Sequence, residues 1–139
     1  MGMPVDANVI LDVFEDDPMW ADWSQGMLDQ CAQESRLYIN PVIYAEVSVG
    51  FERIEELEAA LDVAGFGMLT IPKEALFLAG KVFLRYRRQG GKKLAPLPDF
   101  FIGAHAAVAD LPLLTRDAKR FRTYFPRLKV VHPHERPRV

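Results

Sequence analysis

Residues 3–14 read MPVDANVILDVF, a short apolar run that ends at Asp6 and a second apolar segment that follows it. The run Met3–Val5 has the length of a buried strand, and Asn8–Phe14, flanked by residues that cap helices, is expected to form a short helix. Asp6 therefore falls at the carboxyl end of the first strand, the end at which parallel sheets bind ligands. This strand-then-helix unit sets the pattern for the whole chain.

The remaining sequence repeats the alternation of short apolar runs with amphipathic segments. Further strands are predicted at 37–39, 68–71, 113–115 and 128–131, and further helices at 17–34, 52–64, 73–89, 98–109 and 117–124. Strands that alternate with helices form parallel sheets covered on both faces, because parallel neighbours need crossover connections. We predict one domain over residues 1–139, a three-layer α/β/α fold with a five-stranded parallel sheet.

Charge is divided unevenly along the chain, although the net charge is only −2. Residues 1–70 carry 14 acidic and two basic side chains, whereas residues 71–139 carry five acidic and 15 basic ones. This asymmetry indicates an anionic partner for the second half. Solvated helix faces whose charges intermix after folding explain the same counts, so both interpretations stay open.

The sequence lacks the features of membrane and exported proteins. Its apolar runs are shorter than the ~18 residues of a membrane span, and the N-terminus has no signal-peptide pattern. The single cysteine, Cys31, cannot form an internal disulfide. We therefore expect a cytoplasmic protein without membrane association, in which Cys31 lies in the core or on a helix face.

Three aspartates fall where the predicted sheet brings chain segments together. Asp6 follows the first strand, Asp117 follows the fourth, and Asp99 opens the helix that leads into the fourth. Because ligands of such sheets bind outside the carboxyl ends of the strands, we expect all three at one edge. Aspartate is also a preferred helix-cap residue, which explains any one of them taken alone.

Glu46 is the carboxylate that capping does not explain. In a helix begun by Asn40-Pro41, its neighbours on the same face are Val42, Ile43, Val49 and Gly50. An unpaired charge among apolar groups costs several kcal/mol, so Glu46 should neutralise, pair or bind a cation. A strand would instead place Glu46 on a polar face with Tyr44 and Ser48, and periodicity alone leaves that alternative open.

Four stretches taken together resemble a known family. They are MPVDANVILDVF, PVIYAEVSVGF, LPDFFIGAHAAV and LLTRDAKRF, the last followed by a final strand. In this order they resemble the PIN-domain ribonucleases and, within these, the VapC-type toxins of bacterial and archaeal toxin–antitoxin pairs. No single stretch is specific, but the ordered set covers nearly the whole chain.

The resemblance implies an acidic site that holds Mg²⁺ or Mn²⁺ and supports endonucleolytic cleavage of RNA. The implied metal-binding and catalytic residues are Asp6, Glu46, Asp99 and Asp117, with Glu46 on a helix. Asn8 and Thr115 match positions where the family has supporting polar side chains. The chain departs from the family pattern at Ala7, where Thr or Ser is common, and at Arg120, where a further acid is common.

The expected chemistry suits these residue types. Mg²⁺ prefers oxygen ligands, and crowded carboxylates without a cation raise one another's pKa values. Attack of metal-activated water on the phosphodiester would leave a 5′-phosphate and a 3′-hydroxyl. Basic side chains would contact the flanking phosphates in a salt-sensitive way. The candidates are Arg85, Arg87, Arg88, Lys92, Lys93, Arg116, Lys119, Arg120 and Arg122.

The toxin resemblance also implies partners: an RNA substrate, a cognate antitoxin whose tail covers the site, and a homodimer or toxin–antitoxin hetero-oligomer. Phe14, Trp20 and Trp23 are expected either at such an interface or in the core. The three histidines are expected to be core or surface residues rather than catalytic ones. These are His105, His132 and His134.

Three other classes of protein share parts of this sequence pattern. A catalytically silent PIN-fold module that binds RNA or protein is the main alternative. A haloacid-dehalogenase-like phosphatase is disfavoured because Asn8 stands where a second aspartate is required. A receiver domain is disfavoured because the paired acids after its first strand are missing.

Overall fold

The computed structural model describes residues 2–94 and 97–133. Its elements are β1 (Gly2–Pro4), α1 (Ala7–Phe14), α2 (Ala21–Glu34), β2 (Arg36–Ile39), α3 (Pro41–Ser48), α4 (Ile54–Ala64), β3 (Gly67–Met68), α5 (Lys73–Arg88), α6 (Pro98–Ala109), β4 (Leu113–Leu114), α7 (Ala118–Tyr124) and β5 (Val130–Val131). The pairings between these strands are all parallel. The predicted α/β class with parallel strands is confirmed.

The five strands form two sheets rather than one. β1, β2 and β3 make a three-stranded sheet in that order, and β4 and β5 make a two-stranded sheet. A single parallel bridge between Val5 and Leu114 connects them. The predicted continuous five-stranded sheet is therefore not confirmed. β4 and β5 are each two residues long, and Val5, which follows β1, makes the single described bridge between the two sheets.

The backbone hydrogen bonds of Val5 and Asp6 fix the end of β1 between its two neighbouring strands. Val5 N–H donates to the Tyr38 carbonyl at 2.9 Å on one side, and Asp6 N–H donates to the Leu114 carbonyl at 2.8 Å on the other. β1 thus lies between β2 and β4, and the strand order reverses beside it. A parallel arrangement binds ligands at such a reversal, outside the carboxyl ends of its strands.

Helix α3 begins as the Asn40-Pro41 pair predicted. The Asn40 side-chain oxygen accepts a hydrogen bond from Ile43 N–H at 2.9 Å, and Pro41 occupies the first turn. Both features favour a helix start, because the proline lacks the N–H that would otherwise be orphaned. Glu46 is therefore helical, and the alternative that it lies in a strand is wrong.

Several element boundaries differ from the predicted ones. The second helix begins at Ala21 rather than Asp17, because the Asp17 carboxylate caps a separate turn by accepting from Met19 and Trp20 N–H groups, both at 2.9 Å. β3 is limited to Gly67–Met68, the two residues that pair with β2. The left-handed Gly65, with φ of 81°, closes α4 as predicted.

The core lies where the helices pack on the strands. Its fully buried side chains include Val5, Ile10, Ile43, Ile102 and Leu113. Cys31 is buried and free, as expected of a core residue. No helix in the two described ranges is long and apolar enough to cross a bilayer.

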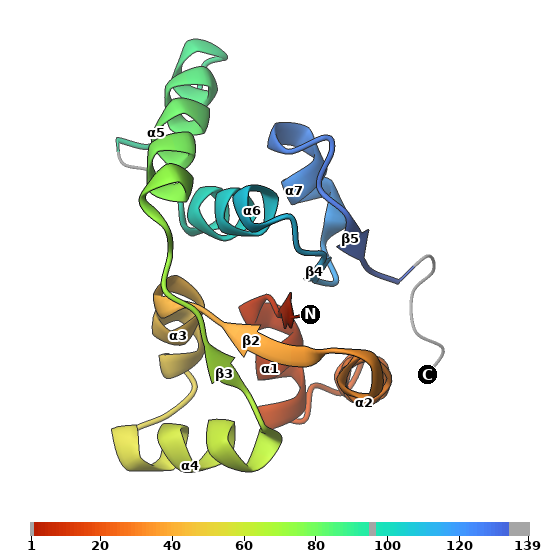
Figure 1. Cartoon of the computed structure of the whole chain (residues 1–139). Helices are drawn as coiled ribbons and strands as arrows, with labels where there is room; N and C mark the ends of the chain where they lie inside the picture. The colour runs from red at the N-terminus through yellow and green to blue at the C-terminus, as the bar shows by residue number, and fades with distance from the viewer. Residues whose placement is uncertain (1, 95–96, 134–139) are drawn as a thin grey trace.

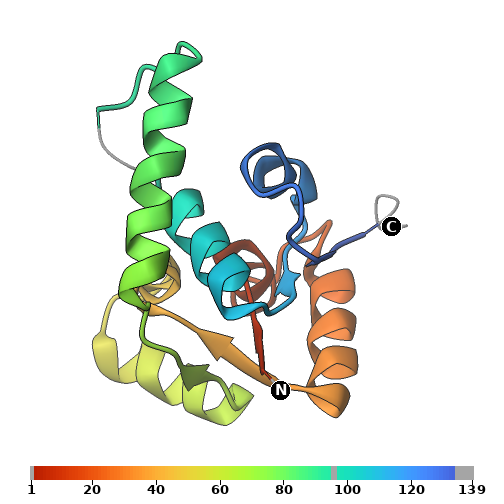
Figure 2. The same ribbon diagram turned by 45° about the horizontal axis from the view of Figure 1, so that its top comes forward.

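The two halves of the chain occupy different regions of the molecule. Figure 1 shows α1 to α4 on the side of β2 and β3, whereas α5, α6 and α7 lie on the side of β4 and β5. Helix α5 extends well beyond the strands in both views (Figures 1 and 2). The acidic first half and the basic second half therefore occupy different regions, and ion pairs such as Arg116–Asp12 and Arg120–Asp6 join them where the regions meet.

Candidate active site at the junction of the two sheets

Asp6 lies at the centre of the polar cluster beside β1. Its side chain is buried, and Oδ1 accepts the N–H of Ala7 at 2.8 Å, which caps α1. Oδ2 accepts from the Thr115 hydroxyl at 2.8 Å and from Arg120 Nη2 at 3.1 Å. Burial raises the pKa of Asp6 above its ordinary value, and the Thr115 hydrogen bond and the Arg120 charge oppose that shift.

Thr115 and Asn8 support Asp6 in the positions that the resemblance implied. The Thr115 hydroxyl donates to Asp6 and accepts from the Asp117 backbone N–H at 3.1 Å. It also lies 3.4 Å from the donating Asn8 Nδ2. These hydrogen bonds connect the ends of β1 and β4, and the bond to Thr115 fixes the position of the Asp117 backbone.

Arg120 contacts three of the four predicted acids. Its Nη2 is 3.1 Å from Asp6 Oδ2, and its Nε is 3.4 Å from Asp99 Oδ2 and 3.1 Å from Asp117 Oδ2. Burial raises the pKa of Asp99, and the Arg120 charge opposes the rise. The structure thus brings Asp6, Asp99 and Asp117 together around one guanidinium group.

Glu46 faces the same cluster from α3. Burial, followed by the negative charges of Asp6 and Asp99, raises its pKa from 4.5 to about 7. One carboxylate oxygen, Oε1, is buried and has no hydrogen-bond partner among the residues that the structure describes. A half-buried carboxylate beside two other acids is an unfavourable arrangement unless a proton or a cation neutralises it.

The donor set fits a hard divalent cation in chemistry but not in its present arrangement. All four acids offer oxygen ligands, and both Glu46 Oε1 and the buried Asn8 Oδ1 lack partners within the described ranges. Yet no group of three or more acidic, histidine or cysteine side chains in residues 2–94 and 97–133 is arranged to hold a metal ion as it stands. Arg120 occupies the position between the carboxylates instead.

The neighbouring Arg116 makes an ion pair that sequence reasoning missed. Its Nε lies 3.1 Å from Oδ2 of Asp12, a buried acid of α1 that also accepts from the Ser24 hydroxyl at 2.8 Å. The Arg116 guanidinium stacks over the Trp20 ring, 5.0 Å from its centroid. Asp12, like Glu46, is a lone acid in an apolar run of the sequence. That pattern could have identified Asp12 as a buried acid that needs a partner.

The remaining candidate RNA-binding residues lie mainly at the end of α5, where they are exposed. Arg85 donates to the Tyr124 carbonyl at 2.9 Å and so ties α5 to α7. Arg87 donates to the carbonyls of Gly91 and Lys93, at 3.2 and 3.1 Å. The exposed side chains of the set are Arg85, Arg87, Arg88, Lys92, Lys93, Lys119, Arg120 and Arg122. Their contact with RNA stays a prediction.

Two of the three aromatic residues and one histidine pack in or against the core. Phe14 and Trp23 pack against the core, and Trp20 meets Trp23 edge to face at 5.9 Å between ring centroids. His105 is buried on α6, where its Nδ1 lies 3.1 Å from Asn40 Nδ2, and burial lowers its pKa. His134 lies outside the described residues.

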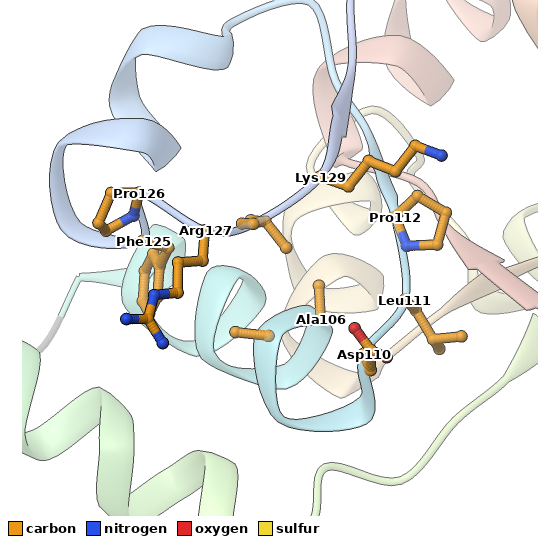
Figure 3. Close-up of a pocket in the computed structure, with 10 residues that line it drawn as sticks. Ala106, Asp110, Leu111, Pro112, Phe125, Pro126, Arg127 and Lys129 are labelled. Carbon is orange, nitrogen blue, oxygen red and sulfur yellow. The ribbon is translucent and has the colours of Figure 1, made fainter.

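A surface hollow of about 610 Å³ lies away from the acid cluster (Figure 3). Residues from the end of α6 and from the α7–β5 connection line it, among them Asp110, Pro112, Phe125, Arg127 and Lys129. None of the four candidate acids belongs to this lining. The acidic site is thus defined by its side chains and not by this hollow.

Several solved structures share the fold, and among them are VapBC proteins and a toxin–antitoxin complex. A chain of VapBC2 from Rickettsia felis, solved with a promoter DNA fragment, matches at a TM-score of 0.73 and 19% identity over 96% of this chain and 99% of that one. A chain of VapBC-1 from nontypeable Haemophilus influenzae matches at 0.70 and 18% identity, over 95% and 98%. A toxin–antitoxin complex from Klebsiella pneumoniae matches at 0.68 and 24% identity, over 96% and 98%.

These likenesses define an α/β fold with short parallel strands. The family model of the PIN domain matches residues 3–126. The chain therefore belongs to the PIN domain family, and the resemblance seen in its four sequence stretches is confirmed at that level. A search of curated protein sequences gives no match.

Proposed function

We propose that this protein is a metal-dependent endoribonuclease and the toxin of a toxin–antitoxin pair. The observation that carries the proposal is the half-buried Glu46 carboxylate, which faces Asp6 and Asp99 and whose Oε1 has no hydrogen-bond partner among the described residues. Folding has gathered four acids, with Arg120 among them, at the carboxyl end of β1, where the order of strands reverses. Such a concentration of perturbed acids at a switch point is typical of a catalytic site.

Each side chain has a role in this proposal. Asp6, Asp99, Asp117 and Glu46 would hold the cation, which is Mg²⁺ or Mn²⁺. Thr115 and Asn8 orient Asp6 and the backbone of Asp117 through the hydrogen bonds described above. The apolar face of α3 keeps Glu46 partly dehydrated, which strengthens its attraction to any cation that replaces its proton. When bound, a divalent cation supplies an activated water and stabilises charge on the phosphate.

The basic side chains of α5 and α7 support a nucleic-acid substrate, and the choice of RNA rests on the resemblance to PIN-domain ribonucleases. Arg88, Lys92 and Lys93 are exposed and would contact RNA phosphates without reading sequence. In-line attack of water would leave a 5′-phosphate and a 3′-hydroxyl. The proposed partner is an antitoxin, since similar chains come from VapBC and other toxin–antitoxin complexes.

One observation favours the second candidate function, a silent module that binds RNA or protein. Arg120 takes up three of the four acids, and no described group of acids is arranged for a metal ion. In this alternative the ion pairs with Arg120 are permanent and the acids serve only the fold.

Cleavage of structured RNA by the purified protein separates the two functions. We expect cutting with Mg²⁺ or Mn²⁺, none with EDTA, and loss of cutting by at least about a hundredfold in Asp6→Asn and Glu46→Gln. Arg127→Gln, which lines the hollow of Figure 3, is the control and should cut normally.

Three outcomes would count against the nuclease. Cutting that survives EDTA would exclude a metal-dependent mechanism, and normal cutting by Glu46→Gln would remove Glu46 from the site. RNA binding without cleavage, across several RNAs and both metals, would establish the silent module instead.

A further inference from the structure

We propose that Arg120 is a built-in counter-cation that holds the acidic site in a metal-free state and must withdraw before a divalent cation binds. The inference rests on the proposed function, because it concerns the same acids. It adds that the chain itself competes with its metal, through a side chain that stands where the family commonly has an acid.

The contacts of Arg120 make this competition unavoidable. Its guanidinium group reaches Asp6, Asp99 and Asp117 at 3.1 to 3.4 Å, so it engages Oδ2 of each. A divalent cation shared by these carboxylates would draw on the same oxygens. Two cations at that spacing also repel each other, so the Arg120 side chain and the metal ion exclude one another.

The position of Arg120 on α7 indicates that the acids hold it in place. It lies in the first turn of the helix, where the helix dipole disfavours a positive charge. The Asp117 side chain, at the N-cap position, makes no capping hydrogen bond, and its Oδ2 pairs with Arg120 Nε instead. Local helix energetics therefore oppose this placement, and the three carboxylates, with the Phe121 ring centroid 5.5 Å from the guanidinium carbon, supply the attraction that maintains it.

The exposure of the two partners shows which one can move. The Arg120 side chain is 44% exposed, whereas the Asp6 side chain is 3% exposed. Arg120 reaches into the cluster from solvent, and it can rotate outward without opening the core. Asp6 cannot move in this way, because Ala7 N–H and the Thr115 hydroxyl hold both of its oxygens.

Calorimetric titration of Mn²⁺ into the full chain tests the inference without measuring cleavage. Arg120→Gln removes the competing charge, and we expect it to bind Mn²⁺ about tenfold more tightly than the parent protein. Arg120→Lys keeps a charge but loses the planar fork, so its affinity should fall between the two. Arg127→Gln, the same change at an exposed arginine outside the cluster, should leave the affinity unchanged.

Thermal unfolding gives a second readout. In EDTA, Arg120→Gln should melt at a lower temperature than the parent, because the buried Asp6 and its two partly exposed neighbours lose their counter-charge. Addition of Mn²⁺ should then raise its melting temperature by more than it raises that of the parent. If Arg120→Gln does not fold, both the Mn²⁺ titration and the thermal unfolding are made with Arg120→Lys.

The outcomes separate failure of this inference from failure of the proposed function. If the Arg120 variants bind Mn²⁺ no more tightly than the parent, while Asp6→Asn abolishes binding, the counter-cation role is overturned and the metal site stands. If the parent and all Arg120 variants fail to bind Mn²⁺ or Mg²⁺, both are overturned.

Discussion

A single half-buried carboxylate tells more about this protein than its overall composition does. Glu46 sits in an apolar stretch, lacks a hydrogen-bond partner for Oε1 in the described structure, and faces two aspartates. Asp12 has the same sequence signature, but it is satisfied by Arg116 and Ser24. A lone acid in an apolar run therefore marks a group that needs a partner, and only the structure shows whether the chain provides one.

The raised pKa of Glu46 predicts how the stability of the metal-free protein depends on pH. The folded pKa is about 7, against 4.5 for the ordinary group, so the folded state binds more protons between these values. Stability then falls as pH rises from 4.5 to about 7 and remains reduced above that window. Glu46→Gln, which stays neutral, should be more stable than the parent at pH 8 by about 1–2 kcal/mol, after allowance for solvent screening.

Urea unfolding in EDTA at pH 4.5 and pH 8 measures this difference. At pH 4.5 Glu46 is largely protonated in the folded protein, so the parent and the variant should then differ little. A stability gap of equal size at both pH values would mean that the gap does not come from ionisation of Glu46.

The sequence anticipated the membership of the acidic cluster but not its internal pairing. The order of strands and helices was enough to place Asp6, Asp99 and Asp117 at one edge, because that depends on topology. The pairing of Arg120 with these acids depends on side-chain conformation across three segments far apart in sequence. The spacing of Asp117 and Arg120, three residues apart on a helix, was the only local indication.

Among the elements, α3 has the most direct effect on the site. Its first turn is fixed by Asn40, whose oxygen caps Ile43 N–H and whose Nδ2 lies 3.1 Å from His105 on α6. The residue is almost completely buried. Asn40 thus sets both where α3 starts and how α3 packs against α6. Because Glu46 lies on α3, Asn40 also determines the position of Glu46.

Substitutions at Asn40 separate these two contributions. Asn40→Ala should destabilise the protein by about 2–3 kcal/mol, because it removes a helix cap and leaves a buried imidazole nitrogen unpaired. Asn40→Ser keeps a capping oxygen and should lose less, about 1 kcal/mol. Chemical denaturation with circular dichroism detection measures both variants, and equal losses would mean that the cap contributes nothing.

The boundaries of elements were harder to predict than their existence. Asp17-Pro18 is a good helix start, yet the Asp17 carboxylate caps an isolated turn and the helix begins four residues later. β3, β4 and β5 are short because each pairs over only two residues with its neighbour. Where a strand ends depends on its partner, which lies elsewhere in the sequence.

At the scale of the whole molecule, the acidic first half and the basic second half of the chain occupy different regions. The first half, which carries 14 acidic and two basic side chains, gathers around β2 and β3. The basic end of α5 lies at the far side of the molecule in Figure 1. The acidic site lies where these two regions meet, at the Val5–Leu114 bridge.

This polarity predicts a salt-sensitive interaction with RNA on the basic side. Using Asp6→Asn as background to prevent cleavage, the double variant Arg88→Gln/Lys92→Gln should bind single-stranded RNA more weakly at low salt. Loss of two phosphate contacts should reduce the slope of log affinity against log salt by about 1.4. Fluorescence anisotropy across a salt series measures the slope.

The matched control removes two positive charges from the acidic region. Arg36→Gln/Arg53→Gln changes the net charge by the same amount, and both arginines are exposed on the first half of the chain. It should leave the slope nearly unchanged. An equal reduction by both double variants would show that net charge, rather than the α5 surface, governs the interaction.

The bridge between Val5 and Leu114 also bears on how the protein is synthesised. Asp6 and Glu46 emerge early from the ribosome, but Asp99, Thr115 and Asp117 must follow before the site has all its members. A nascent chain that ends before β4 has no partner for Val5 on that side and lacks Asp117, the last carboxylate of the cluster. On the proposed function, the acidic site of a nascent chain stays incomplete until Asp117 has been synthesised.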